Sequence, residues 1–342
     1  MSDSDDIYTT ELNDDGVEIK RYEFVIPERH QGRRIDAYMA ARFSDYSRTF
    51  IQALIKDGAV TVDGQTIKPS WSPQGGEHVV ALVPTREHEE IPAQDIPLEI
   101  IYEDDYIVVV NKPPDLVVHP SKGHTTGTLV NALVHHFNEL SDNFGPLRPG
   151  IVHRLDRDTS GAILIIKDNI VHEQIARQFE YREVKKEYVC IVEGRVQLDG
   201  DLIDAPIGKH PRNRLKMMVR GDDGKQARTV YKVVDRIGRF SVVRCFPRSG
   251  RTHQIRVHMA YVGHPIVCDS TYGMRKVIFE SDLTGGEHPP DEQPLLERQA
   301  LHARRITIFH PQREEKMTFE APIPDDMMRL VNALKRLSKA GE

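Results

Sequence analysis

The sequence predicts an α+β protein of two domains: a small N-terminal α/β unit, then a larger domain whose mixed, mainly antiparallel sheet has flanking helices. The chain has 342 residues, about twice the length of an ordinary domain. The stretch 84–97, PTREHEEIPAQDIP, has three prolines, four acids and little apolar content, which is typical of a semi-rigid linker. Beyond it, predicted strands outnumber predicted helices and several form hairpins, which favours this sheet over a doubly wound parallel one.

Residues 21–83 have the pattern of a compact unit. Its predicted elements are, in order, helices over 33–47 and 47–56, a hairpin with the turn Asp63-Gly64, and a strand over Val79–Val83. The larger domain spans 98–342. Its predicted strands are Tyr106–Asn111, Ala162–Lys167, Lys186–Val192, Arg228–Asp235, Phe240–Phe246, Ala303–Phe309 and Lys316–Glu320, and its predicted helices are Thr128–Phe137, Ile170–Phe179, His253–Val262 and Asp325–Leu337. The polar stretch Glu280–Gln299 is predicted to be an excursion loop.

Composition excludes several classes of protein. Hydrophobic residues make up 39% of the chain and charged residues 29%, the balance of a water-soluble globular protein. No apolar run approaches the ~20 residues that cross a bilayer, and the acidic N-terminus lacks the segments of a secretory signal. The cysteines are scattered, odd in number and without a CxxC pair: Cys190, Cys245 and Cys268. We therefore expect a cytoplasmic protein with free thiols and no membrane contact.

Charge is distributed unevenly along the chain. Residues 1–20 have a formal charge of −6, equal to that of the whole chain, and their few apolar positions predict a mobile tail. The remainder is neutral but contains two basic stretches without a single acid. These are 205–220, with Lys209, Arg212, Arg214, Lys216 and Arg220, and 236–268, with Arg236, Arg239, Arg244, Arg248, Arg251 and Arg256. Such clusters are typical of sites for phosphate-rich partners; the alternative is a surface paired with acids distant in sequence.

The segment 149–161, PGIVHRLDRDTSG, is dense in polar groups and precedes the apolar strand AILII. Loops that a rigid strand positions are where catalytic groups concentrate. A polar turn capped by Asp158 and Ser160 is the other reading of the same residues.

Residues 153–161, HRLDRDTSG, resemble the signature of the RluA family of pseudouridine synthases. Two further blocks of that family follow in order, KKEY at 185–188 and SGRTHQIRVHM at 249–259, the latter continuing to Asp269 and Tyr272-Gly273. NKPPDLVVHPS at 111–121 and Leu301-His302-Ala303 are similar to flanking elements of the family. The resemblance covers roughly 98–325 and implies the pseudouridine synthase fold. It departs from the pattern at Cys268, where many members have glycine, which bears only on local packing.

The first domain is similar to an S4 RNA-binding domain, which RluD-type members of the family have in this position. The resemblance implies an RNA partner, preferably large-subunit (23S) ribosomal RNA, with transfer RNA as the alternative. We assign Arg34, Arg48 and Lys56 to phosphate contacts; they are otherwise ordinary surface cations. A monomer is the default expectation.

Isomerisation of uridine breaks the C1′–N1 bond, rotates the uracil and rejoins it through C5, so no cofactor is required. An oxocarbenium-like C1′ needs a nearby carboxylate, as nucleophile or as electrostatic stabiliser, and the family pattern makes it Asp156. Because burial alone raises a carboxyl pKa, a cation is expected beside it, and the resemblance makes Arg256 that cation. It also implies that Tyr188 lies over the uracil and acts as general base at C2′ or C5.

A stacked uridine must be extruded at a cost of a few kcal/mol, and the resemblance gives Arg154 the task of filling the vacated space. His153 is expected to be a hydrogen-bonded scaffold residue beside the substrate. The remaining residues assigned to RNA or substrate contact are Arg251, Ile255, Lys209, Arg212 and Arg214.

Two other classes of protein compete with this hypothesis. One is a non-catalytic RNA-binding or ribosome assembly factor with the same fold, against which the intact set Asp156, Tyr188 and Arg256 argues. The other is a metal-dependent hydrolase, but His172-Glu173 lacks the second histidine of a zinc-binding HExxH helix. No P-loop or GxGxxG is present, so neither a metal nor a nucleotide cofactor is expected.

Overall fold

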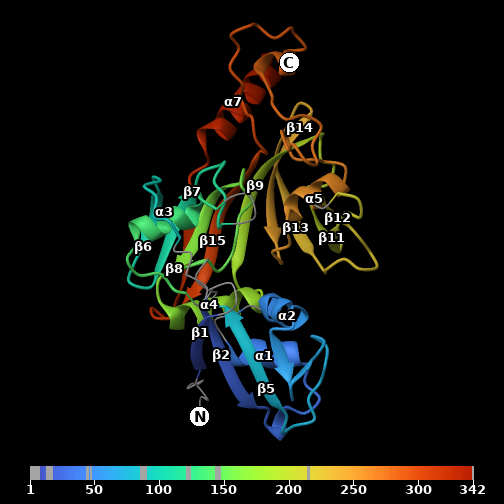
Figure 1. Ribbon diagram of the computed structural model, residues 1–342. Helices are drawn as coiled ribbons and strands as arrows, with labels where there is room; N and C mark the ends of the chain where they lie inside the picture. The colour runs from blue at the N-terminus through green and yellow to red at the C-terminus, as the bar shows by residue number, and fades with distance from the viewer. Residues whose placement is uncertain are drawn as a thin grey trace. The chain divides into compact units, whose positions relative to one another are not determined.

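The computed structural model describes residues 8–12, 18–43, 46, 48–84, 91–120, 125–142, 148–213 and 216–340 (Figure 1). The chain divides into two compact units, 1–90 and 91–342. The division falls inside the stretch predicted to be a linker. Within that stretch, 91–97 is bound to the second unit, since the Asn131 side chain donates to the Pro92 carbonyl and Gln94 accepts from the Gly127 amide.

The first unit is an antiparallel sheet with two helices. Its five strands lie in the order β1 (Tyr8–Leu12), β2 (Glu18–Val25), β5 (His78–Pro84), β3 (Val60–Val62) and β4 (Gln65–Thr66). The helices are α1 (Ile35–Arg42) and α2 (Arg48–Lys56), preceded by a 3-10 turn at Glu28–His30. Ile35, Met39, Ile51 and Ile55 recur at the helical period and are buried together with the inner face of the sheet, which supplies the hydrophobic stabilisation of this unit.

The prediction of a mobile tail over 1–20 is wrong for the part of it that the structure describes. Tyr8–Leu12 forms β1, and β2 begins at Glu18 and pairs with β5. Ile19 and Tyr22 of β2 are buried, and the ring centroids of Tyr8 and Tyr22 are 5.3 Å apart. Glu11 and Glu18, the acids of this stretch that the structure describes, are exposed on these strands. Residues 1–7 and 13–17 lie outside the described residues.

A buried carboxylate joins the two helices of the first unit. The Asp36 side chain is fully buried and accepts hydrogen bonds from Arg34 (2.8 and 3.1 Å), Arg48 (3.0 Å) and Gln52 (2.6 Å). The hydrogen bond and charge of Arg34 outweigh burial and hold the pKa of Asp36 well below its usual range. Arg34 and Arg48, which the sequence assigned to phosphate, therefore bind an internal acid. Lys56 is exposed at the end of α2.

The second unit is built on a nine-stranded sheet. Its main path is β10 (Gly200–Asp204), β13 (Arg228–Ile237), β14 (Phe240–Pro247), β9 (Lys185–Glu193), β15 (Leu301–His310), β8 (Ser160–Ile166), β7 (Ile107–Lys112) and β6 (Glu99–Glu103), with β16 (Glu315–Glu320) paired to β15. Only β15 and β8 pair in parallel among these described strands. The predicted mixed, mainly antiparallel sheet with flanking helices is confirmed.

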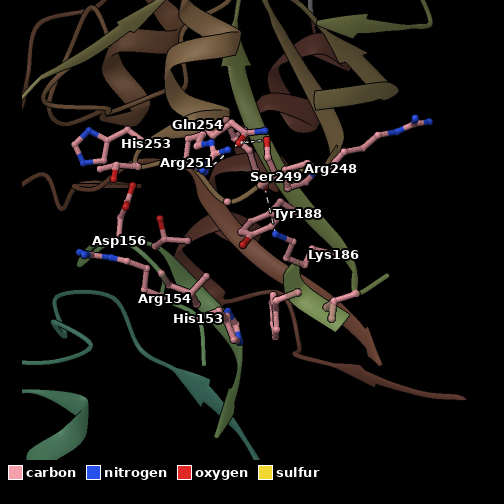
Figure 2. A pocket seen from close by; sticks show the side chains of 18 of the residues that line it. His153, Arg154, Asp156, Lys186, Tyr188, Arg248, Ser249, Arg251, His253 and Gln254 are labelled. Carbon is pink, nitrogen blue, oxygen red and sulfur yellow. Dashed lines mark hydrogen bonds between the residues drawn. The ribbon is translucent and has the colours of Figure 1, made fainter. Parts of the chain in front are cut away.

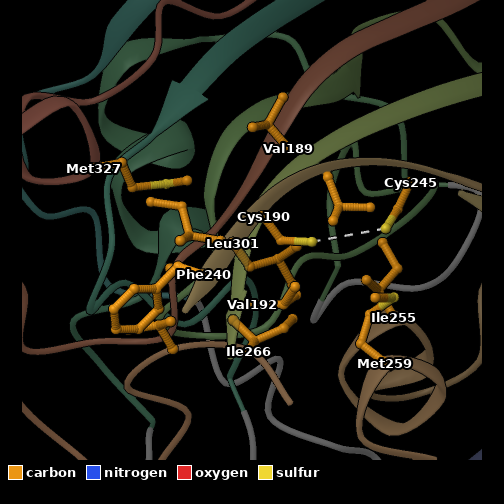
Figure 3. Packing of buried hydrophobic residues seen from close by; sticks show 14 of the residues in the cluster. Val189, Cys190, Val192, Phe240, Cys245, Ile255, Met259, Ile266, Leu301 and Met327 are labelled. Carbon is orange, nitrogen blue, oxygen red and sulfur yellow. Dashed lines mark hydrogen bonds between the residues drawn. The ribbon is translucent and has the colours of Figure 1, made fainter. Parts of the chain in front are cut away.

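Helices cover this sheet, and a small hairpin projects from it. The helices are α3 (Leu129–His136), α4 (Asn169–Glu180), α5 (Gln254–Tyr261), α6 (Glu280–Thr284) and α7 (Asp325–Ala340), and the hairpin is β11 (Ile207–Lys209) with β12 (Met217–Val219). Figure 3 shows Met327 of α7 and Met259 of α5 packed in one cluster with Cys190 and Phe240 of the sheet. The Cys190 and Cys245 sulfurs are 3.7 Å apart, as free thiols. No helix in the described ranges could span a bilayer.

The sequence missed several short or polar elements. Strands β6 and β10 have mostly exposed or half-exposed side chains at the two ends of the sheet, so neither has a strong apolar alternation. Helix α6 lies inside Glu280–Gln299, which was expected to be a loop. It is a single short helix, begun by the Asp282 side chain accepting from the Phe279 amide.

We predict that Asp36→Asn lowers the free energy of unfolding of the first unit by about 1–3 kcal/mol, because an amide cannot accept from all its donors. The contribution of Asp36 is fully present above pH ~4 and is lost as the pH falls toward its lowered folded pKa. Urea unfolding of the full chain at pH 7 measures the loss. Glu23→Gln removes only exposed pairs, with Arg21 and His78, and serves as the control; equal stabilities for the two variants would contradict the prediction.

Candidate functional site

The polar segment 153–159 is a loop that leads directly into β8. Leu155 is buried beneath it and the Thr159 amide donates to the Asp156 carbonyl, which closes a tight turn. Gly161 has φ +116°, and a Cβ there would lie 2.2 Å from the Ala303 carbonyl oxygen. Only glycine allows β8 to approach β15 so closely. The ladder then places Gly161, Ala303 and Tyr188 in one row across three strands.

Asp156 is paired with Arg256 from the distant helix α5. Its Oδ2 lies 3.1 Å from Arg256 Nη1. The other side of the same guanidinium makes two hydrogen bonds to Asp269, of 2.7 Å from Nε and 2.8 Å from Nη2. Arg256 and Asp269 are buried, whereas the Asp156 side chain is 20% exposed and lines a pocket (Figure 2). The structure thus brings together the carboxylate and the cation that the sequence proposed as partners.

Arg256 is held in place from several sides. Although burial opposes it, the hydrogen bonds and charges of Asp269 and Asp156 raise the pKa of Arg256 above its already high value. Burial by itself would raise the pKa of the Asp269 carboxyl, but the hydrogen bonds and charge of Arg256 outweigh burial and lower this pKa. The Asp269 carboxylate further accepts from the backbone amides of Thr271 and Tyr272. The guanidinium is therefore a fixed permanent charge with one edge directed at Asp156.

Tyr272 joins the site to the β11–β12 hairpin. Its hydroxyl is hydrogen-bonded to His253 Nδ1 (2.9 Å) and accepts from the Met217 amide of β12 (2.8 Å). Its ring centroid lies 5.2 Å from Arg256 Cζ, a cation–π distance. His253 begins α5 with φ +56°, so this bond also stabilises a strained turn.

The pocket has a volume of about 310 Å³, and its wall includes Asp156, Tyr188 and Lys186. Lys186 and Tyr188 are two residues apart on β9, so their side chains share one face of the strand. Burial, with a further contribution from the negative charge of Asp156, raises the pKa of Tyr188. The phenol is consequently neutral in the free protein.

His153 forms part of the wall at the base of the loop. Its Nε2 accepts a hydrogen bond of 2.9 Å from the Leu164 amide, and its ring stacks on Phe179 at 5.0 Å. Burial lowers the pKa of His153 to about 3, so the ring is neutral at physiological pH. These contacts are those of the scaffold residue that the sequence proposed.

Two cations hold the polar loop from below. The fully buried Lys112 Nζ donates to the carbonyls of Pro113 (2.6 Å), Leu116 (2.9 Å) and Arg157 (2.9 Å). Burial lowers the pKa of Lys112 to about 7, while three acceptors favour the charged form. Arg298 donates to the Asp158 carbonyl and binds Asp326 through two hydrogen bonds. The loop is thus anchored on both sides of Asp156.

The other predicted contact residues fall in different places. Arg154, Arg251 and Ile255 line the pocket with Asp156. Lys209 and Arg212 are exposed on the β11–β12 hairpin. Arg214 lies outside the described residues. Arg34, Arg48 and Lys56 belong to the first unit.

The stretch 236–268 does not form one basic surface. Arg236 is paired with Asp199 and Arg244 with Glu187, and Arg239 donates to the Asp282 carbonyl. The alternative of acidic partners distant in sequence is therefore correct for Arg236, Arg244 and Arg256, whereas Arg239 binds a backbone carbonyl. Arg248 and Arg251 remain on the pocket wall.

Sequence reasoning assigned no role to Lys112, Lys186, Asp269 or Tyr272. Lys112 ends the apolar run IVVVNK, and a lysine at the end of a buried strand is a usable signal. For the other three residues, the partner lies on a distant element, so sequence spacing alone contains no indication of it. Among the described residues, no group of three or more His, Cys, Asp or Glu could hold a metal ion.

Comparison with known proteins places the site in context. Residues 106–261 match the RNA pseudouridylate synthase family and residues 33–79 match the S4 domain. An uncharacterized RNA pseudouridine synthase of Bacillus subtilis is 42% identical over 90% of this chain and 96% of its own length. Ribosomal large subunit pseudouridine synthase D of Xanthomonas campestris is 39% identical, over 91% and 92%. The solved structure of human RNA pseudouridylate synthase domain containing 1 is similar, with a TM-score of 0.50 and 26% identity over 71% of this chain and 97% of that one.

We predict that Lys112→Met increases amide hydrogen exchange in 154–161 by about tenfold or more, because each of the carbonyls left without a donor costs roughly 1–3 kcal/mol. Exchange followed by mass spectrometry measures this loop directly. Lys167→Met is the matched control, because Lys167 binds Glu103 and the Asp104 carbonyl away from the loop. Unchanged exchange in the Lys112 variant would show that the loop does not depend on this anchor.

Proposed function

Because the chain belongs to the family of RNA pseudouridine synthases, we propose that it isomerises specific uridines of large-subunit ribosomal RNA, with Asp156 as the catalytic carboxylate. The observation that supports the assignment of Asp156 is its position. Asp156 lines the pocket and is paired with Arg256, and the opposite edge of the Arg256 guanidinium is bound by Asp269. The RNA class rests on relatives such as pseudouridine synthase D of Xanthomonas campestris, which is similar over more than nine-tenths of both chains, and on the S4 domain.

The reaction conserves every atom of the nucleotide. The C1′–N1 bond breaks, the uracil turns within the pocket, a C1′–C5 bond forms, and the proton lost from C5 is balanced by one gained at N1. Asp156 serves this sequence either by attacking the sugar or by stabilising positive charge at C1′. In both cases the carboxylate must be ionised, and the Arg256 guanidinium 3.1 Å away favours that form.

Tyr188 is proposed to lie against the uracil and to take a proton from C2′ or C5. Burial, and less strongly the charge of Asp156, raises its pKa, so the phenol is protonated in the free protein and must give up its own proton before it can act as a base. The contribution from Asp156 disappears when that carboxylate binds the sugar or becomes neutral. Proton transfer to Tyr188 is therefore expected after Asp156 has acted.

Arg154 is proposed to replace the extruded uridine in the RNA stack. Its side chain is exposed, and it stands two residues from Asp156 at the edge of the pocket. A planar guanidinium there can stack on a base and hydrogen-bond at the same time. Arg251, Lys209 and Arg212 are proposed to contact the RNA backbone. Transfer RNA remains the alternative substrate, and the RNA mapping below distinguishes the two.

We predict that Asp156→Asn lowers turnover by roughly 10³-fold or more while RNA affinity stays within about threefold, because the carboxylate acts on the reacting sugar. Chemical mapping of pseudouridine in total RNA should show ribosomal sites that disappear on deletion of the gene and return only with the wild-type protein. Asp115→Asn, an exposed acid near the loop and outside the pocket lining, is the control and should restore the sites. Restoration by Asp156→Asn would overturn the assignment, and sites confined to transfer RNA would change the substrate.

We predict that Tyr188→Phe binds RNA with unchanged affinity and loses about 10²-fold or more in single-turnover rate, because the ring remains and the proton acceptor is gone. Single-turnover kinetics over pH 6–9 measure the chemical step. A rate equal to that of the wild-type protein would leave Tyr188 as a stacking wall without a part in proton transfer.

A further inference from the structure

Lys186 is a cation of the pocket for which the proposed mechanism has no use. Its Nζ donates to the Ser249 carbonyl at 3.3 Å and lies 6.0 Å from the centroid of the Phe179 ring. No acid among the described residues forms an ion pair with it. Beside it stands Gly250, where an added Cβ would lie 3.7 Å from Nζ, so the backbone leaves room next to the amine. Figure 2 shows the amine directed toward the turn that contains Ser249.

The pocket as a whole has an excess of positive charge. Besides Lys186, its wall includes Arg154, Arg182, Arg248 and Arg251, whereas Asp156 is its only acid. Asp156 shares Arg256 with Asp269, so these three groups together have a charge of −1, which the five cations of the wall exceed. The wall histidines do not alter this balance, because burial lowers the pKa of both His153 and His253.

A half-buried ammonium without a counter-ion is costly to the folded protein. Burial lowers the pKa of Lys186 to about 8, which still leaves most molecules charged at pH 7. The stabilising anion is therefore expected from the ligand. A uracil carbonyl is neutral and would supply only a dipole, whereas a phosphodiester supplies a full negative charge and several acceptor oxygens.

We propose that Lys186 binds a phosphodiester adjoining the target uridine and that this wall of the pocket is a phosphate subsite. The proposal rests on the proposed function, since it takes a uridine in RNA as the ligand. In a nucleotide the ribose separates each phosphate from C1′. A carboxylate at C1′ and a cation at the phosphate must then stand apart, as do Asp156 in the loop before β8 and Lys186 on β9. The subsite would position C1′ against Asp156 by binding a group that takes no part in the reaction.

The decisive experiment combines a protein variant with an altered RNA. Lys186→Met removes the charge at similar length, and an RNA with one uncharged methylphosphonate linkage beside the target uridine removes the phosphate charge. The methylphosphonate is placed on the 5′ or on the 3′ side of the target uridine, in two separate RNAs. We expect Lys186→Met alone, and the neutral linkage on one of these sides alone, each to lower kcat/KM by roughly 10- to 100-fold. In the Lys186→Met protein, that same linkage should lower kcat/KM little further. Lys186→Arg should restore most of the activity and the sensitivity to that linkage. Lys185→Met, on the exposed side of the same strand, should behave as wild type.

Two results would overturn the subsite. One is that both neutral linkages cost the Lys186→Met variant as much as they cost the wild-type protein. The other is that the variant loses discrimination between uridine and cytidine while it remains sensitive to both linkages, which would place the amine at the base.

A binding measurement separates failure of the subsite from failure of the proposed function. Calorimetric titration with 3′-UMP, 5′-UMP and uridine requires no turnover. The wild-type protein should bind one monophosphate roughly tenfold or more tightly than uridine, and Lys186→Met should lose that difference. The same preference in both proteins would overturn the subsite, even if the wild-type protein modifies RNA. Absence of pseudouridine with wild type, together with the expected titrations, would reject the proposed function and leave the anion subsite standing.

Discussion

The site depends on one buried cation shared by two carboxylates. Arg256 binds Asp269 through two hydrogen bonds and Asp156 through a third, and it thereby joins the polar loop before β8 to helix α5, 100 residues away in sequence. Loss of Arg256 would leave Asp156 and the buried Asp269 without their shared counter-ion, and an unpaired buried charge is strongly unfavourable. The same ion pairs that position Asp156 therefore also require the loop and the helix to pack together.

The sheet provides the second constraint. Strands β8 and β15 approach in parallel at Gly161, and β15 continues the row to Tyr188 on β9. The loop with Asp156 and the strand with Tyr188 consequently meet at the same end of the sheet. Because a shift by one residue would turn Tyr188 to the opposite face, the close approach at Gly161 bears directly on the geometry of the pocket. Lys112 and Arg298 then hold the loop against this frame through backbone carbonyls.

Local patterns predicted much of the fold, and the family resemblance proposed Asp156, but neither predicted the partners of the charged residues. The long strands and the helices of the second unit have strong periodicity, whereas β1, β6 and β10 are half-exposed strands whose polar residues obscure it. Nothing in the sequence distinguishes Arg34 and Arg236 from Arg154, yet Arg34 binds the buried Asp36 and Arg236 binds Asp199. The fold decides which arginines have acidic partners, and those partners lie from two residues away, as for Arg34, to 100 residues away, as for Arg256 and Asp156. The residue block identified Asp156, while the roles of Asp269 and Tyr272 required the structure.

The arrangement of charges also bears on the order of events. A pocket for RNA must attract a polyanion, yet the proposed reaction needs a carboxylate inside it. Arg256 behind Asp156 reduces this conflict, because Asp156, Asp269 and Arg256 together have a charge of −1 while the basic side chains of the wall outnumber it. Burial, and less strongly the ionised Asp156, raises the pKa of Tyr188, so the phenol is protonated in the free protein. In the proposed reaction, loss of the Asp156 charge as the carboxylate engages the sugar removes the smaller of these two effects, so the coupling of the two side chains favours cleavage of the glycosidic bond before proton removal.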